Sequence, residues 1–152
     1  MGGYFGIVSR QDCVEDVFFG TDYHSHLGTR RAGIAVYDPT IGLQRKIHSI
    51  QTTPFRARFK DIFDEMQGTS AIGCISDFYP QPLLIRSRLG TFALCVTGAV
   101  NNADALMQSY WEEGGHFDAM TGGAVNATEL IASLISLRSD FASGIRFVQQ
   151  QV

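Results

Sequence analysis

The order of strand-forming and helix-forming segments constrains the fold of this chain more than any single motif does. Along the sequence come short β-prone runs, an amphipathic helix, further strands and then helices. A doubly wound parallel sheet needs strands and helices that alternate, so this order favours a layered sandwich of the α+β class. With 152 residues, of which 45% are hydrophobic, the chain has the size and apolar content of one domain with one core.

Apolar spacing and turn chemistry locate the expected elements. Strands over 33–37 and 43–49 flank a turn at 38–43, which predicts a β-hairpin. Apolar residues three and four apart predict one amphipathic helix over Phe55–Met66, and Asn126 with Glu129 three residues later predicts the capped start of another helix. The remaining expected segments are strands at 4–9, 71–75, 83–86 and 92–96 and helices at 13–26, 101–114 and 141–152.

Charge and cysteine content exclude several classes of protein. A net charge of −3 offers neither a basic surface for nucleic acid nor a polybasic patch for an anionic membrane. The N-terminus has no signal-peptide pattern, and the longest apolar runs have strand length, far below the ~20 residues of a membrane span. The three cysteines show no spacing typical of a disulfide framework or a zinc site. We therefore expect a soluble cytoplasmic protein with no nucleic-acid or membrane partner.

Six short segments carry a more specific pattern, at residues 2–8, 26–34, 71–77, 81–82, 96–102 and 126–129. They read GGYFGIV, HLGTRRAGI, AIGCISD, QP, VTGAVNN and NATE. In the same order, they resemble the family segments Cys-Gly-Ile-x-Gly-Ile, His-Arg-Gly-x-Asp-x-Ala-Gly-Ile, Gly-Ile-Gly-His-x-Arg-Tyr, Gln-Pro, His-Asn-Gly-x-x-x-Asn and Thr-Asp-Thr-Glu. These belong to the class II glutamine amidotransferases, the N-terminal-nucleophile glutaminases, and the amidophosphoribosyltransferase branch is the most similar.

The resemblance implies a fold and a domain organisation. It implies a four-layer αββα sandwich, in which two antiparallel sheets lie between helical layers. Glutaminase domains of this family continue for several further strands. We therefore expect residues 1–152 to be one glutaminase-like domain that lacks its last strands, with no second domain in this chain. The expected partner is a downstream phosphoribosyltransferase-like domain or a second copy of the chain, in a homo-oligomer.

The resemblance also implies what glutamine hydrolysis needs. A cysteine at the mature N-terminus attacks the amide with its own α-amine as base, and an Asn-Gly pair forms the oxyanion hole. An arginine binds the substrate carboxylate, and an aspartate binds the substrate ammonium. The matching positions are Gly2 for the nucleophile, Thr97 and Gly98 for the oxyanion hole, and Ser76 and Ala127 for substrate binding. Apart from the Gly98 N–H group, the required groups are missing, so the catalytic residues have degenerated.

These substitutions predict a glutamine amidotransferase-like domain without glutaminase activity, which acts as a scaffold or regulates a downstream phosphoribosyltransferase. Two alternatives stay open. One is an active amidotransferase domain in purine nucleotide synthesis. The other is a sensor of small anions in the vacated pocket around Ser76, Thr97 and Arg30, with Arg31 as a further anion ligand. The alternative to anion binding is that Arg30 and Arg31 are solvated arginines of the protein surface. We expect no cofactor.

His24 and His26, with Asp22 nearby, allow a metal-binding interpretation. Histidines two residues apart converge on one ion only in a strand, and this segment is predicted to end a helix. No partner residue stands at a recognised ligand spacing. We therefore expect no metal site, and histidines at a helix end that face water or a carbonyl group.

The cysteines allow a catalytic interpretation as well. Cys74 and Cys95 fall within apolar strand patterns, and Cys13 begins an apolar helical stripe. Cysteine in such surroundings behaves as a small buried hydrophobe. Core packing is therefore the expected role of all three.

Overall fold

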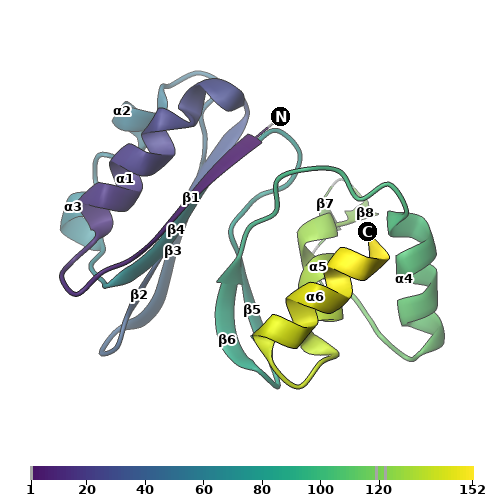
Figure 1. The fold of residues 1–152 in the computed structure, drawn as a ribbon. Coiled ribbons are helices and arrows are strands. Elements are labelled where there is room, and N and C mark those ends of the chain that lie inside the picture. The colour runs from purple at the N-terminus through teal and green to yellow at the C-terminus, as the bar shows by residue number, and fades with distance from the viewer. Residues whose placement is uncertain (1, 119, 122) are drawn as a thin grey trace. The chain divides into compact units, whose positions relative to one another are not determined.

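The computed structural model describes residues 2–118, 120–121 and 123–152, and the chain forms two compact units. The first unit consists of Met1–Leu84 and Ala93–Gly98, and the second of Ile85–Phe92 and Ala99–Val152. Figure 1 shows the helices and strands of both units. The chain has a mixed α and β fold, as predicted.

One four-stranded antiparallel sheet forms the centre of the first unit, with the strand order β1-β4-β2-β3. Its strands are β1 (Gly2–Val8), β2 (Arg31–Asp38), β3 (Gly42–Ser49) and β4 (Ser70–Ser76). The predicted hairpin is confirmed, because β2 pairs directly with β3. In its turn, the Asp38 carboxylate accepts hydrogen bonds from the backbone N–H groups of Thr40 and Ile41 at 2.8 and 3.0 Å. Gly42 closes the turn with a φ of +90°, a conformation that favours glycine.

Helices cover one face of this sheet, as Figure 1 shows. They are α1 (Val14–Tyr23), the short 3₁₀ helix η1 (Ser25–Leu27), α2 (Phe55–Phe59) and α3 (Ile62–Glu65). The core lies between the helices and the sheet face that alternate strand residues present to them. Its buried side chains are Cys13, Val14, Val17, Phe18, Ala32, Ile34, Val36, Phe55, Phe59, Ile62, Ala71 and Ile75.

The prediction of one continuous helix over Phe55–Met66 is wrong. The segment forms the two short helices α2 and α3, joined by a turn at residues 60–61. Apolar spacing reports which side of a segment faces the core, but it does not report whether the backbone hydrogen bonds run on without interruption. Here the Asp61 carbonyl starts a new turn by accepting from the N–H groups of Asp64 and Glu65 at 3.2 Å. The predicted buried side is correct, since it includes the fully buried Phe55, Phe59 and Ile62.

The strand predicted over 92–96 is displaced toward the N-terminus. Strand β6 spans Gly90–Leu94 and pairs with β5 (Leu83–Ser87) in a two-stranded sheet. Val96 lies beyond the strand because its backbone pairs with a side chain. The Val96 N–H donates to Gln81 Oε1 at 2.6 Å, and Gln81 Nε2 donates to the Val96 carbonyl at 3.0 Å. A side chain that takes the place of a neighbouring strand leaves no trace in the alternation of apolar and polar residues.

Three helices provide most of the second unit, together with a short two-stranded sheet. These elements are α4 (Ala103–Glu112), β7 (Met120–Thr121), β8 (Ala124–Val125), α5 (Ala127–Ser136) and α6 (Phe141–Gln151). The predicted capped start of a helix is confirmed, since Asn126 Oδ1 accepts from the Thr128 N–H at 2.9 Å. The Glu129 carboxylate accepts from the Asp118 N–H at 2.7 Å. The other predicted helices and strands are present, with ends shifted by a few residues.

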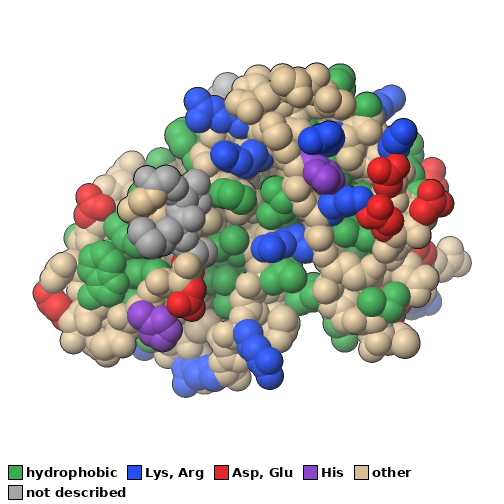
Figure 2. Space-filling model, turned by 180° about the vertical axis from the view of Figure 1, so that it is seen from behind, with side chains coloured by type: hydrophobic (Ala, Val, Ile, Leu, Met, Phe, Trp, Pro, Cys, Tyr) green, Lys and Arg blue, Asp and Glu red, His purple; other side chains and the backbone are tan. Residues whose placement is uncertain are grey.

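The surface mixes side chains of different kinds. On the face drawn in Figure 2, Lys and Arg side chains stand among hydrophobic and uncharged ones. In the second unit, Arg88 is used structurally, because it donates to the carbonyl groups of Ser136 and Arg138 at 2.8 and 2.6 Å, at the end of α5. Among the helices of the described residues, none has both the length and the hydrophobicity of a membrane span.

Gly33→Ala is expected to destabilise the first unit. A Cβ at Gly33 would overlap the Gln81 carbonyl oxygen and lie 2.7 Å from Pro82 Cδ, so backbone must move. Overpacking of this kind costs about 1–3 kcal/mol. Gly6→Ala is the matched control, because the nearest atom to its Cβ would be Ile72 Cγ2 at an ordinary 3.7 Å. Denaturant unfolding of both variants checks this expectation, and equal stability would contradict it.

Candidate functional site

Three of the predicted site residues are neighbours at one end of the central sheet. Gly2 of β1 lies opposite Ser76 of β4, and Ser76 lies opposite Arg31 of β2. Ile75, the residue before Ser76, is buried in the core beneath the helices. Because side chains alternate between the two faces of a strand, Gly2, Ser76 and Arg31 share the face that points away from this core.

The side chain of Gln81 joins this end of the sheet to the segment after β6. Gln81 is 3% exposed, and besides its two hydrogen bonds with Val96 its Nε2 donates to Ser76 Oγ at 3.3 Å. Ser76 Oγ also accepts from the Tyr79 N–H at 3.3 Å. The peptide bond between Gln81 and Pro82 is cis. The oxygen and the nitrogen of the buried Gln81 amide are therefore both hydrogen-bonded, and these bonds hold Val96 beside Ser76.

Thr97 completes a small group with Gly2 and Ser76. A Cβ built on Gly2 would lie 3.6 Å from Thr97 Cγ2, so Thr97 borders Gly2. The same Cβ would lie only 2.5 Å from the carbonyl oxygen of Ile75, a separation that real Cβ atoms do not adopt. The present backbone therefore leaves no room for any side chain at Gly2. Gly98 follows with a φ of +133° and open space around its Cβ position.

Ala127 belongs to the second unit, where it occupies the first turn of α5. It is half-buried and carries no polar group. The preceding Asn126 caps the helix with its side chain. The hydroxyl of the following Thr128 is buried, with no hydrogen-bond partner among the described residues. The polar side chain that caps this helix start is therefore that of Asn126, next to Ala127.

The candidate anion ligands Arg30 and Arg31 follow a turn that Asp77 organises. Asp77 Oδ1 accepts hydrogen bonds from the backbone N–H groups of Thr29 and Arg30 at 2.7 and 3.0 Å. The bond from Thr29 contributes most to lowering the pKa of Asp77, because it stabilises the charged carboxylate. Arg31 Nη1 donates to the Phe78 carbonyl at 3.2 Å, and Arg30 is exposed. The Arg31 guanidinium therefore has a partner within the protein.

His24 and His26 lie at the end of α1 and in η1, as the helix-end interpretation predicts. The Tyr23 ring packs edge-on against both, with ring centroids 5.5 Å from His24 and 6.3 Å from His26. His24 also lies against Gly3, where a Cβ would be 3.0 Å from His24 Cβ. Among the residues that the structure describes, no group of three or more His, Cys, Asp or Glu side chains is placed to hold a metal ion.

Two of the three cysteines have the predicted packing environment, and the third does not. Cys13 and Cys74 are 0% and 1% exposed. Cys95 lies beyond β6 and is half-buried. Burial raises the pKa of Cys13. For Cys95, the interpretation as a buried strand residue is therefore wrong, because the strand ends one residue earlier.

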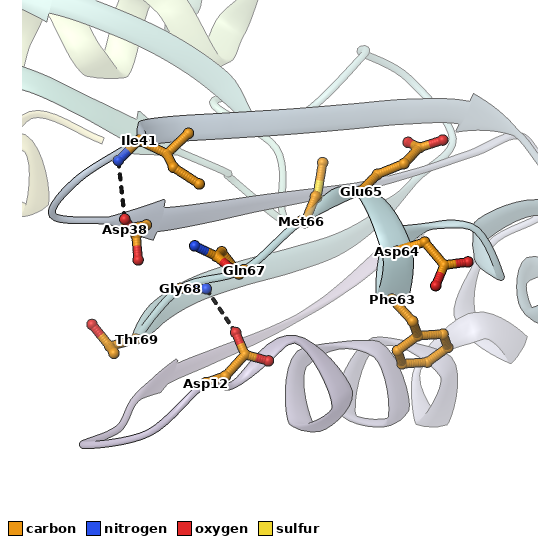
Figure 3. Close-up of a pocket in the computed structure, with 10 residues that line it drawn as sticks. All are labelled: Asp12, Asp38, Ile41, Phe63, Asp64, Glu65, Met66, Gln67, Gly68 and Thr69. Carbon is orange, nitrogen blue, oxygen red and sulfur yellow. Dashed lines mark hydrogen bonds between the residues drawn. The ribbon is translucent and has the colours of Figure 1, made fainter.

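A separate cavity of about 670 Å³ lies beside the β2–β3 turn of the first unit, as Figure 3 shows. Carboxylates and apolar side chains line it together. Asp12 Oδ1 accepts from the Gly68 N–H at 2.7 Å, and Asp38 holds the hairpin turn. Glu65 forms an ion pair with Lys46. The carboxylates of Asp12, Asp38 and Glu65, which line this cavity, thus each interact with another group of the protein.

Gln81 and Asp77 organise the site, although no individual role for either is predicted from the sequence. Gln81 belongs to a matching Gln-Pro pair, and it is a polar residue directly before an apolar run. Asp77 directly follows the apolar strand β4. A polar residue at the end of a buried strand can indicate that its side chain organises nearby backbone by hydrogen bonds. The backbone groups that it binds are distant in sequence, so only the fold shows them.

Two solved structures have a similar fold. The structure of the glutamine phosphoribosylpyrophosphate (PRPP) amidotransferase from B. subtilis, complexed with ADP and GMP, matches 99% of this chain with a TM-score of 0.74 and 25% sequence identity. A structure of the allosteric regulatory enzyme of purine biosynthesis matches 99% with a TM-score of 0.80 and 24% identity. Each match covers 33% of the other chain, so this chain spans about a third of their length. A scan against family models finds no match, and a search of curated proteins finds none.

Asp77→Ala is expected to lower the free energy of unfolding by about 1 kcal/mol at neutral pH, because two backbone N–H groups lose a charged but partly solvated acceptor. The folded-state pKa of Asp77 lies below its ordinary value of 3.8. The stability that the charged Asp77 carboxylate contributes is therefore fully present above the pKa that Asp77 has in the unfolded chain. It is lost as the pH falls through the pKa that Asp77 has in the folded chain.

Denaturant unfolding as a function of pH checks this expectation. The difference between wild type and Asp77→Ala should shrink as the pH falls below 3.8, the ordinary pKa of the group. Asp77→Asn is the control, because its amide oxygen still accepts hydrogen bonds but does not titrate in this range. A stability difference between wild type and Asp77→Ala that does not change with pH would contradict the role of the charge.

Proposed function

We propose that this chain is a glutamine amidotransferase-like domain without glutaminase activity, which holds or regulates a phosphoribosyltransferase-like partner or associates with itself. The similarity of 99% of the chain to about a third of PRPP amidotransferase supports this proposal, as do the six matching segments. The proposal includes a glutaminase-like domain over residues 1–152 and the four-layer αββα sandwich. A cytoplasmic location and a connection with purine synthesis belong to it as well.

Gly2 is the observation that carries the proposal. The resemblance puts the nucleophilic cysteine at this position, and glycine has no thiol. The structural surroundings of Gly2 agree with this loss, because a Cβ would stand 2.5 Å from the Ile75 carbonyl oxygen. Gly2 also pairs with Ser76 in the strand register. The position is thus used for close strand packing.

The substrate-binding positions support the same conclusion. Ser76 stands where an arginine would bind the glutamine carboxylate, and its hydroxyl is occupied as an acceptor by Gln81 and the Tyr79 N–H. Thr97 stands where an asparagine would donate to the oxyanion, and Ala127 where an aspartate would bind the ammonium. Neither Ser76 nor Ala127 can supply a charge. Glutamine would therefore bury its two charged groups without charged partners, which is unfavourable.

A working amidotransferase would need a different nucleophile. Cys13 and Cys74 are buried, and Cys95 is half-buried. None of the three can use its own α-amine as the base, since each is bonded within the chain. The active alternative therefore has less support than the inactive one.

The purified chain is expected to release no glutamate from glutamine, because it cannot present a thiol at the mature N-terminus. A coupled glutamate assay checks this, with the triple variant Cys13→Ala, Cys74→Ala, Cys95→Ala measured alongside. Turnover in both chains would mean that a nucleophile other than cysteine is present. Turnover in the wild type alone would identify one of these cysteines as catalytic.

Gly2→Cys alone is expected not to restore the activity. The substrate would still lack two charged hydrogen bonds of ~1.5–3 kcal/mol each, which corresponds to roughly two to four orders of magnitude in binding. The new side chain must also displace the Ile75 carbonyl.

The same glutamate assay, with intact mass to verify removal of the first methionine, measures the outcome. Gly2→Ala is the matched control for the steric effect, because it adds the Cβ without the thiol. Substantial turnover in Gly2→Cys would show that Ser76 and Ala127 do not occupy the substrate-binding positions assigned to them.

A further inference from the structure

His48 is a half-buried imidazole at the edge of the central sheet of the first unit. It belongs to β3, the last strand in the order β1-β4-β2-β3, and lies opposite the buried Ala32 of β2. Residues that lie opposite each other on paired strands point to the same face, so His48 is on the side that carries the helices. Its ring contacts that of Phe59 in α2, with centroids 5.1 Å apart and an angle of 73° between the rings. A titratable group therefore borders the apolar core.

A chain of aromatic contacts connects His48 with α1, α2 and α3. Phe59 stacks on Phe55 with ring centroids 4.7 Å apart, and Phe55 contacts Phe18 of α1 at 5.3 Å. Phe18 in turn contacts Phe63 of α3 at 4.8 Å. The contact of His48 with Phe59 is the end of this chain at β3. It is therefore one of the contacts that hold α2 and α3 against the sheet.

The segment over residues 55–66, here called the α2–α3 segment, depends on such packing. Its two helices have five and four residues. Helices shorter than about 12 residues are marginal in water on their own. The segment is held through the buried side chains of Phe55, Phe59 and Ile62. An element whose order comes from packing can open locally while the rest of the fold stays intact.

The charged groups around His48 come from β3 and from the α2–α3 segment. Lys46 precedes His48 by two residues on the same face of β3, and Glu65 of α3 pairs with this lysine. Arg58 belongs to α2, and Asp61 to the turn before α3. Burial is the largest cause that lowers the pKa of His48 below its ordinary 6.5, and Arg58 and Lys46 lower it further. Glu65 and Asp61 act in the opposite direction. The closed segment therefore favours the neutral imidazole.

We propose that His48 is a pH-sensitive switch, which keeps the α2–α3 segment on the sheet when it is neutral and shifts the segment toward a locally open form when it is protonated. This role goes beyond the proposed function and does not rest on it. In the open form the imidazolium gains water, and Arg58 moves away from it with α2. Phe63, Asp64, Glu65 and Met66 of the segment line the cavity beside the β2–β3 turn (Figure 3). Opening therefore removes part of the wall of this cavity.

The direction of the pH dependence follows from the lowered pKa. The closed form has its full stability above the pKa of His48 in the open form, which is the ordinary 6.5. It loses stability as the pH falls through this value, and the loss is complete below the pKa of His48 in the closed form. Each unit between the two pKa values favours the open form up to about tenfold.

Hydrogen–deuterium exchange of the full chain tests the proposal at about pH 7.5 and about pH 5.5, a range in which histidine is the side chain whose ordinary pKa is crossed. After correction for intrinsic exchange rates, the protection of peptides from residues 55–66 should fall several-fold at the lower pH, and that of β1 and β4 should not. His48→Gln should keep the same protection at both values, because its side chain does not titrate. His116→Gln is the matched control, since His116 is an exposed histidine of the second unit and its loss should leave the wild-type response unchanged.

The permanently charged variant His48→Lys should show low protection of residues 55–66 at both pH values. If this variant does not fold, NMR titration of the wild-type chain decides, with the His48 signal assigned by its absence in His48→Gln. The pKa of His48 should lie below 6.5. A pKa above 6.5 would show that the attraction of an imidazolium for the Phe59 ring outweighs its burial, and would overturn the proposal.

The exchange experiment can overturn the proposal in three further ways. Protection of residues 55–66 in the wild type that does not change with pH would exclude the switch. An equal loss in His48→Gln would assign the pH dependence to another group. A loss that extends equally over the strands of the central sheet would show unfolding of the whole unit in place of local opening.

Discussion

The pairing of β1 with β4 is the constraint on which the rest of the candidate site depends. It sets Gly2 opposite Ser76 and puts the Ile75 carbonyl oxygen where a side chain at Gly2 would project. The backbone of both strands is committed to this pairing, so a rotamer change cannot make room for a side chain. Gly2 is thus a packing position in this fold, which agrees with the proposal that no nucleophile acts there.

A single side-chain amide extends that arrangement beyond the sheet. Gln81 binds both backbone groups of Val96 and the hydroxyl of Ser76. A buried polar group left without its partner costs about 1–3 kcal/mol, so Gln81 stabilises the segment that follows β6. Gly33 makes this possible, because a Cβ there would overlap the Gln81 carbonyl oxygen. One glycine and one glutamine therefore determine where Val96, and hence Cys95 and Thr97, can lie.

Local patterns predicted much of the fold and little of the site. The hairpin over β2 and β3 and the capped start of α5 at Asn126 were predictable, because turn chemistry and capping depend on residues close in sequence. The interruption between α2 and α3 was not, since apolar spacing records the buried side alone. The hydrogen bonds of Gln81 with Val96 and of Asp77 with the Thr29–Arg30 turn join residues far apart in sequence. No local pattern contains that information.

Titration with L-glutamine, followed through the backbone amide NMR signals of Ser76, Thr97 and Gly98, measures whether the chain still binds this substrate, because it detects binding without requiring turnover. We expect no saturable change in these signals at millimolar glutamine, because Ser76 and Ala127, at the positions proposed for the substrate carboxylate and ammonium, carry no charge. Saturable shifts confined to these three residues and their neighbours would contradict it. They would show that the site recognises glutamine although Gly2 carries no thiol.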